Sequence, residues 1–251
     1  MTRLLFIIVL FNVSQVIYSQ DIFELVDQAN EYYINNEYEL AIEKYQAVLD
    51  SDYESAQLHY NLGNAYFKSH KLTMALVCYE RAYLLDPTDE EISHNLNMAR
   101  KYVVDEIDVL PELQLKIWFK RFAGILSSDS WAHFSISAFI LALLLLLFYL
   151  FSKRLMIRKI TFWIAVFSLF ISISCYTLAY QQKKLVYDHN FAIISSPSVT
   201  IKSSPDESGT ELFQLHEGTK VVIIDQLGDW REIKLSDGNV GWLRLDNIIM
   251  L

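Results

Sequence analysis

The sequence predicts a multi-domain membrane protein with an all-α repeat stack, a two-helix transmembrane hairpin and a small all-β domain. Two apolar stretches of membrane-spanning length occupy residues 131–151 and 160–180. A helical pattern that repeats every 34 residues precedes them, and short β-rich runs separated by glycines follow them. The mean hydropathy of +0.20 is high for a soluble domain, because the apolar residues are concentrated in the two stretches.

The composition excludes several classes of protein. The 30 acidic residues outnumber the 21 basic ones, which gives a net charge of −9. A nucleic-acid-binding protein would instead carry a basic face to neutralise phosphates. Two cysteines exclude a disulfide-stapled scaffold and a four-cysteine zinc site. Outside the apolar segments no soluble block exceeds about 90 residues, which is small for most enzyme folds.

Residues 1–20 have the layout of a secretory signal peptide. Arg3 supplies the positive start, Leu4 to Phe11 form a short apolar run, and Ser19 is a small residue at a cleavage position. The run is shorter than the ~20 residues that cross a bilayer. The polar residues after it favour cleavage, and an uncleaved N-terminal anchor is the alternative.

The two long apolar stretches predict a hairpin of transmembrane helices, since each matches a hydrocarbon core of about 30 Å. The connecting residues 152–159 form the predicted cytoplasmic loop. They contain four cations and no acid: Lys153, Arg154, Arg158 and Lys159. Short basic loops stay in the cytoplasm, so both flanks of the hairpin are expected outside it. The signal peptide independently exports the segment from residue 21, which predicts inner-membrane anchorage with both soluble domains in the periplasm.

Residues 111–130 form a juxtamembrane segment with an amphipathic pattern. At 100° per residue the apolar side chains of 112–126 share one arc and the cations lie opposite. The arc holds Leu115, Trp118, Phe119, Phe122, Ile125 and Leu126, and the cations are Lys116, Lys120 and Arg121. This pattern predicts a helix lying on a membrane surface, and a helix packed on the preceding domain is the alternative.

Residues 21–110 carry the internal repeat. An offset of 34 places Ala29 on Gly63, Tyr32 on Tyr66, Tyr38 on Leu72, Ala41 on Ala75 and Tyr45 on Tyr79. The second copy, from Ala56, resembles the tetratricopeptide repeat. It has that family's characteristic residues at Leu62, Gly63, Tyr66, Ala75, Tyr79, Ala82 and Pro87, with His59 in place of the early Trp. A fading third copy from Glu90 predicts a capping helix. An unrelated pair of helical hairpins is the alternative.

The resemblance implies a peptide-binding groove lined by the first helix of each repeat. The lining positions are Phe23, Val26, Asn30, Tyr33, Tyr60, Asn61, Asn64 and Phe67. One subfamily holds a C-terminal carboxylate between asparagines and cations, and Asn30 and Asn61 match its asparagines. Val26, Glu91 and Asn95 replace its cations, which favours ordinary polar groove residues instead. From residue 21 to 107 there are 17 acids and six bases, a net charge of −11, so a basic or apolar partner is expected.

Residues 190–251 predict five or six short strands in a small barrel. The order of landmarks resembles the bacterial SH3-like domain, with Gly228-Asp229-Trp230, Asp237-Gly238 and Gly241-Trp242 at that family's positions. Trp230 and Trp242 have two interpretations: they line a ligand face, or they fill the core of a small barrel. The resemblance does not fix a ligand.

No residue pattern predicts catalysis, a cofactor or a metal site. No two of the six histidines are three to five residues apart, and the nucleophile-elbow, P-loop and dinucleotide motifs are missing from the sequence. Cys78, in the good repeat, is expected to be a small buried hydrophobe, and Cys175 falls in the second apolar stretch. The sequence therefore predicts that the protein is not an enzyme.

The order of modules, together with the stretch LPELQLKIWFKRFAGILSSDSW at residues 110–131, resembles the BatE proteins of the Bacteroidota aerotolerance operon. That resemblance implies an adaptor that works with other Bat membrane proteins carrying von Willebrand A domains, in envelope maintenance or oxidative-stress tolerance. The predicted function is a non-enzymatic periplasmic scaffold that uses its repeats to dock protein partners and binds no nucleic acid. The alternative is a cell-wall sensor whose SH3-like domain binds peptidoglycan peptides.

Overall fold

The structure is a computed structural model that describes residues 22–107, 114–187 and 190–251. The predicted signal peptide, residues 1–20, lies outside the described residues. The chain divides into two compact units. Residues 22–107 and 190–251 form one, here called the repeat–sheet unit, and residues 114–187 form the other, here called the hairpin unit.

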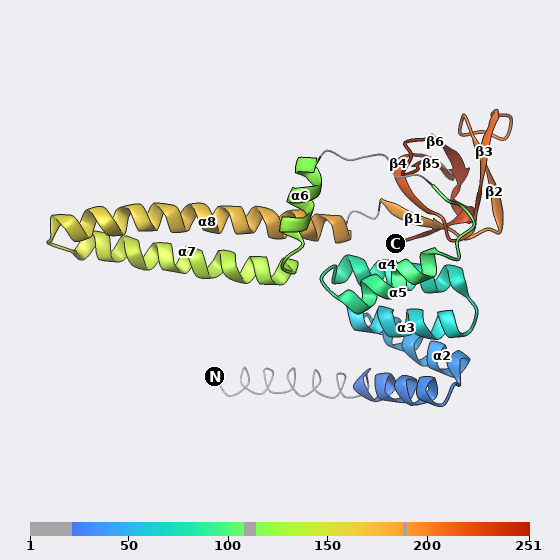
Figure 1. Cartoon of the computed structure of the whole chain (residues 1–251), viewed down its shortest axis with the longest axis horizontal. Coiled ribbons are helices and arrows are strands. Elements are labelled where there is room, and N and C mark those ends of the chain that lie inside the picture. Colours follow the sequence, from blue (N-terminus) through green and yellow to red (C-terminus); the bar gives the residue numbers. More distant parts are fainter. Residues whose placement is uncertain (1–21, 108–113, 188–189) are drawn as a thin grey trace, which may run out of the picture. The chain divides into compact units, whose positions relative to one another are not determined.

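The repeats fold as consecutive helices (Figure 1). The first covers residues 22–34, and it is followed by α2 (Tyr38–Leu49), α3 (Ala56–Lys68), α4 (Leu72–Leu85) and α5 (Glu90–Arg100). Ser55 caps α3 by accepting a hydrogen bond from the Leu58 amide at 3.1 Å. Asp89 caps α5 in the same way, by accepting from the backbone amides of Glu91 and Ile92. Helix α4 ends at Leu85, two residues before Pro87, which cannot continue it.

The period of 34 residues is visible in the backbone. Asn36 and His70 both lie in the turn between two helices of a pair, with left-handed φ of 63° and 60°. Gly63 of α3 faces α4 so closely that a Cβ there would lie 2.8 Å from the Tyr79 ring. This close approach of α3 and α4 explains why the repeat pattern has a small residue at Gly63.

Residues 191–250 form an antiparallel seven-stranded sheet in the order β3-β2-β6-β5-β4-β1-β7. The strands are β1 (Phe191–Ile194), β2 (Ser198–Lys202), β3 (Glu211–His216), β4 (Lys220–Leu227), β5 (Trp230–Lys234), β6 (Val240–Arg244) and β7 (Ile248–Met250). Ile201, Ile233 and Leu243 lie in its buried core. The predicted all-β character is confirmed, but the sheet has seven strands where the sequence predicted five or six. Its SH3-like barrel character stays a prediction.

The repeats and the sheet share a hydrophobic core. Ile193 of β1 and Leu251 belong to the buried cluster of the repeat helices, and Phe191 and Ile249 pack against it. The sequence predicts two separate soluble domains, but the structure combines them in one compact unit. Local periodicity did not reveal this contact, because residues 108–189 separate its two sides in the chain.

A buried carboxylate also joins the two parts. Glu80 of α4 is 1% exposed. It accepts hydrogen bonds from Arg100 Nη2 of α5 at 2.5 Å and from Lys220 Nζ of β4 at 2.6 Å. A buried carboxylate is tolerated when it is paired in this way. Arg81, the next residue, donates to the Met250 carbonyl at 2.9 Å.

Asp105 makes a second polar link. Its carboxylate accepts from the His216 backbone amide at 2.7 Å, from His216 Nδ1 at 2.7 Å and from Thr219 Oγ1 at 2.6 Å. Burial raises the pKa of Asp105, but the hydrogen bonds from Thr219 and His216 outweigh burial and hold the pKa below its ordinary value. The charged form of Asp105 therefore stabilises the fold.

We expect Asp105→Asn to destabilise the repeat–sheet unit by about 2 kcal/mol at neutral pH, because bonds to a charged acceptor are lost. A depressed folded-state pKa gives stability that is complete above about pH 4 and is lost as pH falls through that lower pKa. The deficit of the variant should therefore shrink in acid, as measured by thermal unfolding with near-UV circular dichroism. Glu106→Gln, at the exposed neighbouring acid, is the control. An equal deficit at neutral and acid pH would contradict the prediction.

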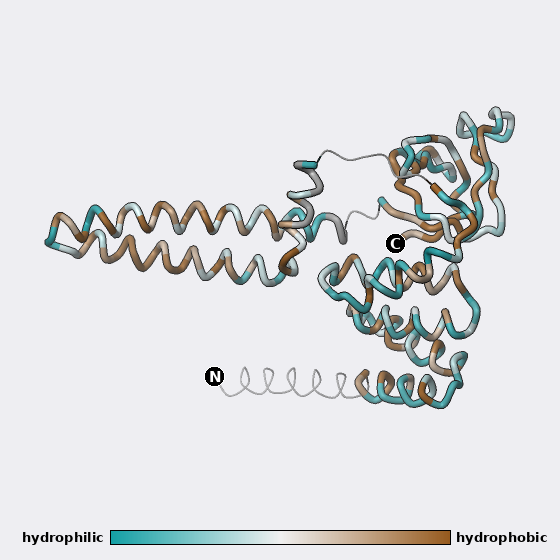
Figure 2. The backbone as a smooth tube through the Cα atoms, viewed as in Figure 1, coloured by the Kyte–Doolittle hydropathy of each residue, from teal (hydrophilic) through white to brown (hydrophobic). Residues whose placement is uncertain are grey.

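The hairpin unit contains α6 (Gln114–Ala123), α7 (Ser128–Phe151) and α8 (Leu155–Tyr187). Helix α7 and residues Leu155–Lys184 of α8 are long and apolar enough to cross a membrane. Figure 2 shows hydrophobic residues along both helices. Because α8 begins at Leu155, the connecting loop is short, and Arg158 and Lys159 of the predicted loop lie on the helix.

Small polar residues join α7 to α8. The hydroxyls of Ser135 and Ser172 each donate to the other residue's carbonyl at 2.9 Å. Ser168 Oγ donates to the Ala138 carbonyl at 2.8 Å. The large side chains of α7, such as Leu141 and Phe148, are exposed. This arrangement, with small residues between helices and large apolar ones outside, is typical of helix packing in lipid.

Helix α6 forms where the sequence predicts an amphipathic helix. Trp118, Phe119 and Phe122 are exposed, and the Trp118 and Phe122 rings stack with their centroids 5.8 Å apart. The helix is tied to the hairpin, since Trp131 Nε1 donates to the Ala123 carbonyl at 2.9 Å. Exposed aromatic rings at this end of the hairpin suit a membrane interface.

Candidate functional site: an asparagine and tyrosine ladder on the repeats

A polar ladder connects the repeats through side chains of their helices. In its first step, Asn30 Oδ1 accepts from Tyr45 OH at 2.6 Å and from Asn61 Nδ2 at 3.4 Å. In its second step, Asn64 Oδ1 accepts from Tyr79 OH at 2.7 Å and from Asn95 Nδ2 at 2.9 Å. The three residues of the second step follow those of the first by 34 positions each. The repeat period therefore applies to these hydrogen bonds as well as to the backbone.

Buried phenols fix the orientation of the two central amides. Tyr45 and Tyr79 are each 1% exposed. Burial raises the pKa of Tyr45 to about 12 and raises that of Tyr79 further. Both phenols therefore stay protonated and donate to the Oδ1 atoms of Asn30 and Asn64. With each Oδ1 facing the interior, the Nδ2 groups of Asn30 and Asn64 are directed away from it.

The Nδ2 groups of Asn30 and Asn64 are available as hydrogen-bond donors. Asn30 and Asn64 are partly exposed, and within residues 22–107, 114–187 and 190–251 no hydrogen bond uses their Nδ2 groups. An amide N–H of this kind suits a peptide carbonyl as acceptor. Two such donors, one per repeat, can bind successive carbonyls of an extended chain.

The structure places the asparagines of the predicted groove in the ladder. The apolar residues of the predicted groove differ in their exposure. Val26, Tyr33, Tyr60 and Phe67 are partly buried against the repeat core. Tyr60 OH accepts from Asn95 Nδ2 at 3.0 Å, so it also joins the ladder. Phe23 is 56% exposed, which makes it an accessible apolar contact.

Three ladder members lie outside the site that the sequence predicts. The sequence identifies Tyr45 and Tyr79 only as positions of the repeat pattern, and Asn95 only as the replacement of a cation. The offset of 34 that aligns Tyr45 with Tyr79 also aligns Asn30 with Asn64 and Asn61 with Asn95. This joint recurrence of polar residues was the pattern that could have revealed the ladder.

Trp230 and Trp242, the predicted ligand face of the C-terminal domain, are half-buried and belong to neither hydrophobic core of the described residues. Trp242 pairs with Lys202 and Glu232 across the sheet, and Trp230 pairs with Arg244. The alternating Ile233 and Leu243 face the core, which places both tryptophans on the outer face of the sheet. Lys202 Nζ lies 5.9 Å from the centroid of the Trp230 ring.

The two thiols are unsuited to chemistry at this site. Cys78 is buried in α4, as the sequence predicts, and burial raises its pKa to about 12. Its thiol therefore stays protonated and unreactive at physiological pH. Cys175 lies in α8, in the other compact unit.

Paired helices with a fixed period and a shared polar face define a helical-repeat protein of the interaction class. Comparison with known families specifies the repeat. A model of the TPR repeat matches residues 29–70, and a model of the tetratricopeptide repeat matches residues 56–89. The predicted tetratricopeptide repeats are therefore confirmed, and they point to a scaffold for protein–protein interaction. No curated protein matches the chain.

Proposed function

We propose that this protein is a non-enzymatic adaptor that a transmembrane hairpin anchors to the cytoplasmic membrane, with the repeat–sheet unit in the periplasm. Its repeats bind an extended segment of a partner protein. The observation that carries the proposal is the pair of oriented Nδ2 donors of Asn30 and Asn64. Neither donor is used within the described part of the fold, and the repeat period spaces them along one face.

The ladder suits the backbone of a partner more than a particular side chain. Each Nδ2 offers N–H donors, and every residue of an extended peptide offers a carbonyl acceptor. The exposed ring of Phe23 adds an apolar contact beside the donors. The net charge of −11 over residues 21–107 favours a segment with basic residues and disfavours an acidic one.

The shared core supports the hairpin topology. Residues before and after the hairpin pack together around Ile193 and Leu251, so both must lie on one side of any membrane that the chain crosses. An even number of crossings satisfies that requirement, and two suitable helices lie between the two parts. The basic residues Lys153 and Arg154 at the turn favour the cytoplasm for that end, which leaves the periplasm for the repeat–sheet unit.

The test of the adaptor replaces both donors without disturbing the buried phenols. Asn30→Asp with Asn64→Asp keeps an oxygen acceptor for Tyr45 and Tyr79 but replaces each outward N–H donor by a carboxylate oxygen. A photo-crosslinking residue at position 23 then records partners in living cells. We expect the double variant to lose the crosslinked partner by about tenfold or more, because two hydrogen bonds become repulsions with carbonyls.

A matched control carries the same two added charges elsewhere on the repeats. Asn35→Asp with Asn97→Asp changes two exposed asparagines that take no part in the ladder. Crosslinking that survives in the control and fails in the ladder variant supports the proposal. Equal loss in both variants would assign the effect to net charge, and unchanged crosslinking in both would contradict docking at this face.

The second candidate function is a sensor of cell-wall peptides on the outer face of the sheet. The half-buried Trp230 and Trp242 favour it, because they place two aromatic rings on the outer face of the sheet. Lys202 lies beside the Trp230 ring, and its charge is paired with Glu207 at 3.1 Å. The test titrates the full chain in detergent with peptidoglycan stem peptide and follows tryptophan fluorescence. A saturable change that disappears in Trp230→Ala and persists in Trp118→Ala would favour the sensor, and no change would exclude it.

We also propose that the partners include Bat-type membrane proteins with von Willebrand A domains, in envelope maintenance or oxidative-stress tolerance. The order of repeats, hairpin and β-domain supports this assignment by resemblance. Identification of the proteins crosslinked at position 23 tests it directly.

A further inference from the structure

We propose that the loop end of the hairpin holds a site for the headgroup of an anionic phospholipid. The site is a cavity of about 330 Å³ between the end of α7 and the start of α8. Tyr149, Leu155, Arg158, Lys159, Phe162 and Trp163 line it. This inference rests on the proposed membrane anchorage, since a lipid reaches the site only if the hairpin lies in a bilayer.

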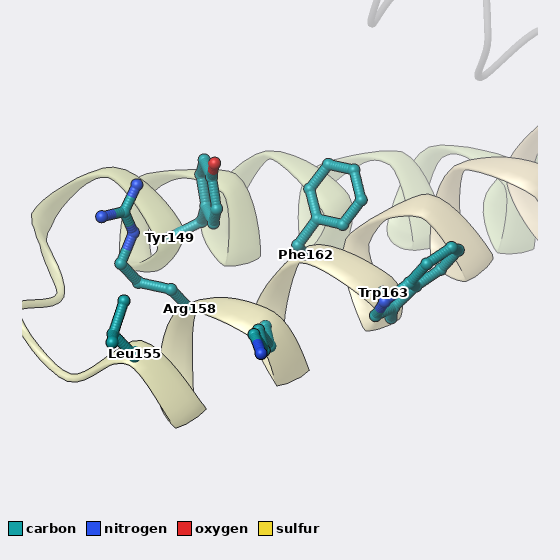
Figure 3. Close-up of a pocket in the computed structure, with 6 residues that line it drawn as sticks. Tyr149, Leu155, Arg158, Phe162 and Trp163 are labelled. Atoms are coloured by element: carbon teal, nitrogen blue, oxygen red, sulfur yellow. The ribbon is translucent and has the colours of Figure 1, made fainter.

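The cavity combines two cations with aromatic walls (Figure 3). Arg158 lies over the Tyr149 ring, with Cζ 5.1 Å from the centroid. This contact positions the guanidinium at the cavity without consuming its hydrogen-bond donors. The Phe162 ring lies 5.7 Å from that of Tyr149 and 5.6 Å from that of Trp163, which continues the wall along α8.

The charge of the site is uncompensated. The sequence from Ser130 to Tyr187 contains no Asp or Glu. In the described residues neither Arg158 nor Lys159 forms an ion pair with a carboxylate. The two cations therefore attract an anion from outside the chain, and the fork of an arginine matches the oxygens of a phosphate.

The position of the cavity along the hairpin favours a lipid headgroup over other anions. The apolar run of α7 ends at Phe151, and the charged turn follows within three residues. The cavity thus lies where hydrocarbon gives way to headgroups. Leu155 is 71% exposed and Trp163 is 68% exposed, so an apolar surface for acyl chains adjoins the cations. Basic pockets between membrane helices on the cytoplasmic side bind acidic headgroups by this combination of contacts.

The test uses the full chain in lipid nanodiscs prepared with equal amounts of phosphatidylglycerol and phosphatidylcholine. Native mass spectrometry then counts the lipids that stay bound after release from the disc. We expect the wild-type chain to retain phosphatidylglycerol in preference to phosphatidylcholine. Arg158→Gln with Lys159→Gln should reduce the preference about thirtyfold, since two cations near the headgroups are lost.

Lys153→Gln with Arg154→Gln is the matched control, because it removes the same charge from the adjoining turn and none from the cavity lining. A preference that is lost only in the cavity variant supports the site. Equal loss in both variants would overturn it in favour of diffuse attraction to a basic turn. A wild-type chain that shows no preference would also overturn it, as would displacement of the lipid by inorganic phosphate.

The same preparation separates this proposal from the anchorage on which it rests. Elution of the chain apart from the discs would overturn the membrane anchorage and the lipid site together. Incorporation into the discs without a lipid preference would overturn the lipid site alone.

Discussion

Replacing Gly63 by valine should unfold the repeat pair locally. A Cβ at this position lies 2.8 Å from two atoms of the Tyr79 ring, and that ring is buried in the repeat core. The ring cannot withdraw without moving α4, so we expect a cost of about 3 kcal/mol, at the upper end for overpacked cores. Hydrogen–deuterium exchange of peptides from α3 and α4 should become about a hundredfold faster.

Lys68→Val is the control for this substitution. Lys68 is exposed at the end of the same helix, so valine there changes helix propensity without overpacking. Exchange in the Lys68→Val variant should stay near the wild-type rate. If Gly63→Val also exchanged at the wild-type rate, the close approach of α3 and α4 would not be a packing constraint.

Gly218→Val should separate the sheet from the repeats. Gly218 has a left-handed φ of 87°, and a Cβ there would lie 3.0 Å from Leu76 Cδ1 and 3.1 Å from Val103 Cγ2. Backbone strain and the clash together should cost about 3 kcal/mol. Because Leu76 belongs to the repeat core, we expect faster exchange in α4 as well as in β4.

Gly228→Val separates the clash from the strain. Gly228 also has a positive φ, of 56°, but a Cβ there meets nothing within 4 Å. This control should cost about 1–2 kcal/mol and should speed exchange only near the turn between β4 and β5. A Gly218→Val variant whose effect stays within the sheet would show that the two parts of the repeat–sheet unit unfold independently.

Features governed by local sequence were predictable. The repeat period identified the helical pairs and the small residue at Gly63, because helix contact recurs at fixed spacing. Hydropathy located the two apolar helices, since length and composition alone determine whether a helix can cross a bilayer. Short β-rich runs separated by glycines predicted the all-β character of the C-terminal domain. Each of these patterns operates within a few tens of residues.

Features that join distant segments were not predictable in the same way. The contacts of Glu80 with Lys220 and of Asp105 with His216 join residues on either side of the hairpin segment in the chain. The sequence around a single charged residue does not indicate which distant residue it pairs with. In the candidate site, the sequence identified Asn30, Asn61 and Asn64, whereas it marked the buried phenols that orient them only as positions of the repeat. A buried tyrosine both fills space and donates a hydrogen bond. The repeat pattern indicates that it fills space but does not indicate the acceptor of its hydrogen bond.

The shared core also sets an order of events in time. The ribosome makes the repeats first, and residues 190–251 follow only after the whole hairpin segment. Until then, the surface of the repeats that receives Ile193 and Leu251 has no cover. Closing the loop formed by residues 108–189 is a late and non-local step, of the kind that slows folding. A chain interrupted before its last strands would therefore carry an exposed apolar patch on its repeats, by which quality-control proteases can distinguish it from a finished molecule.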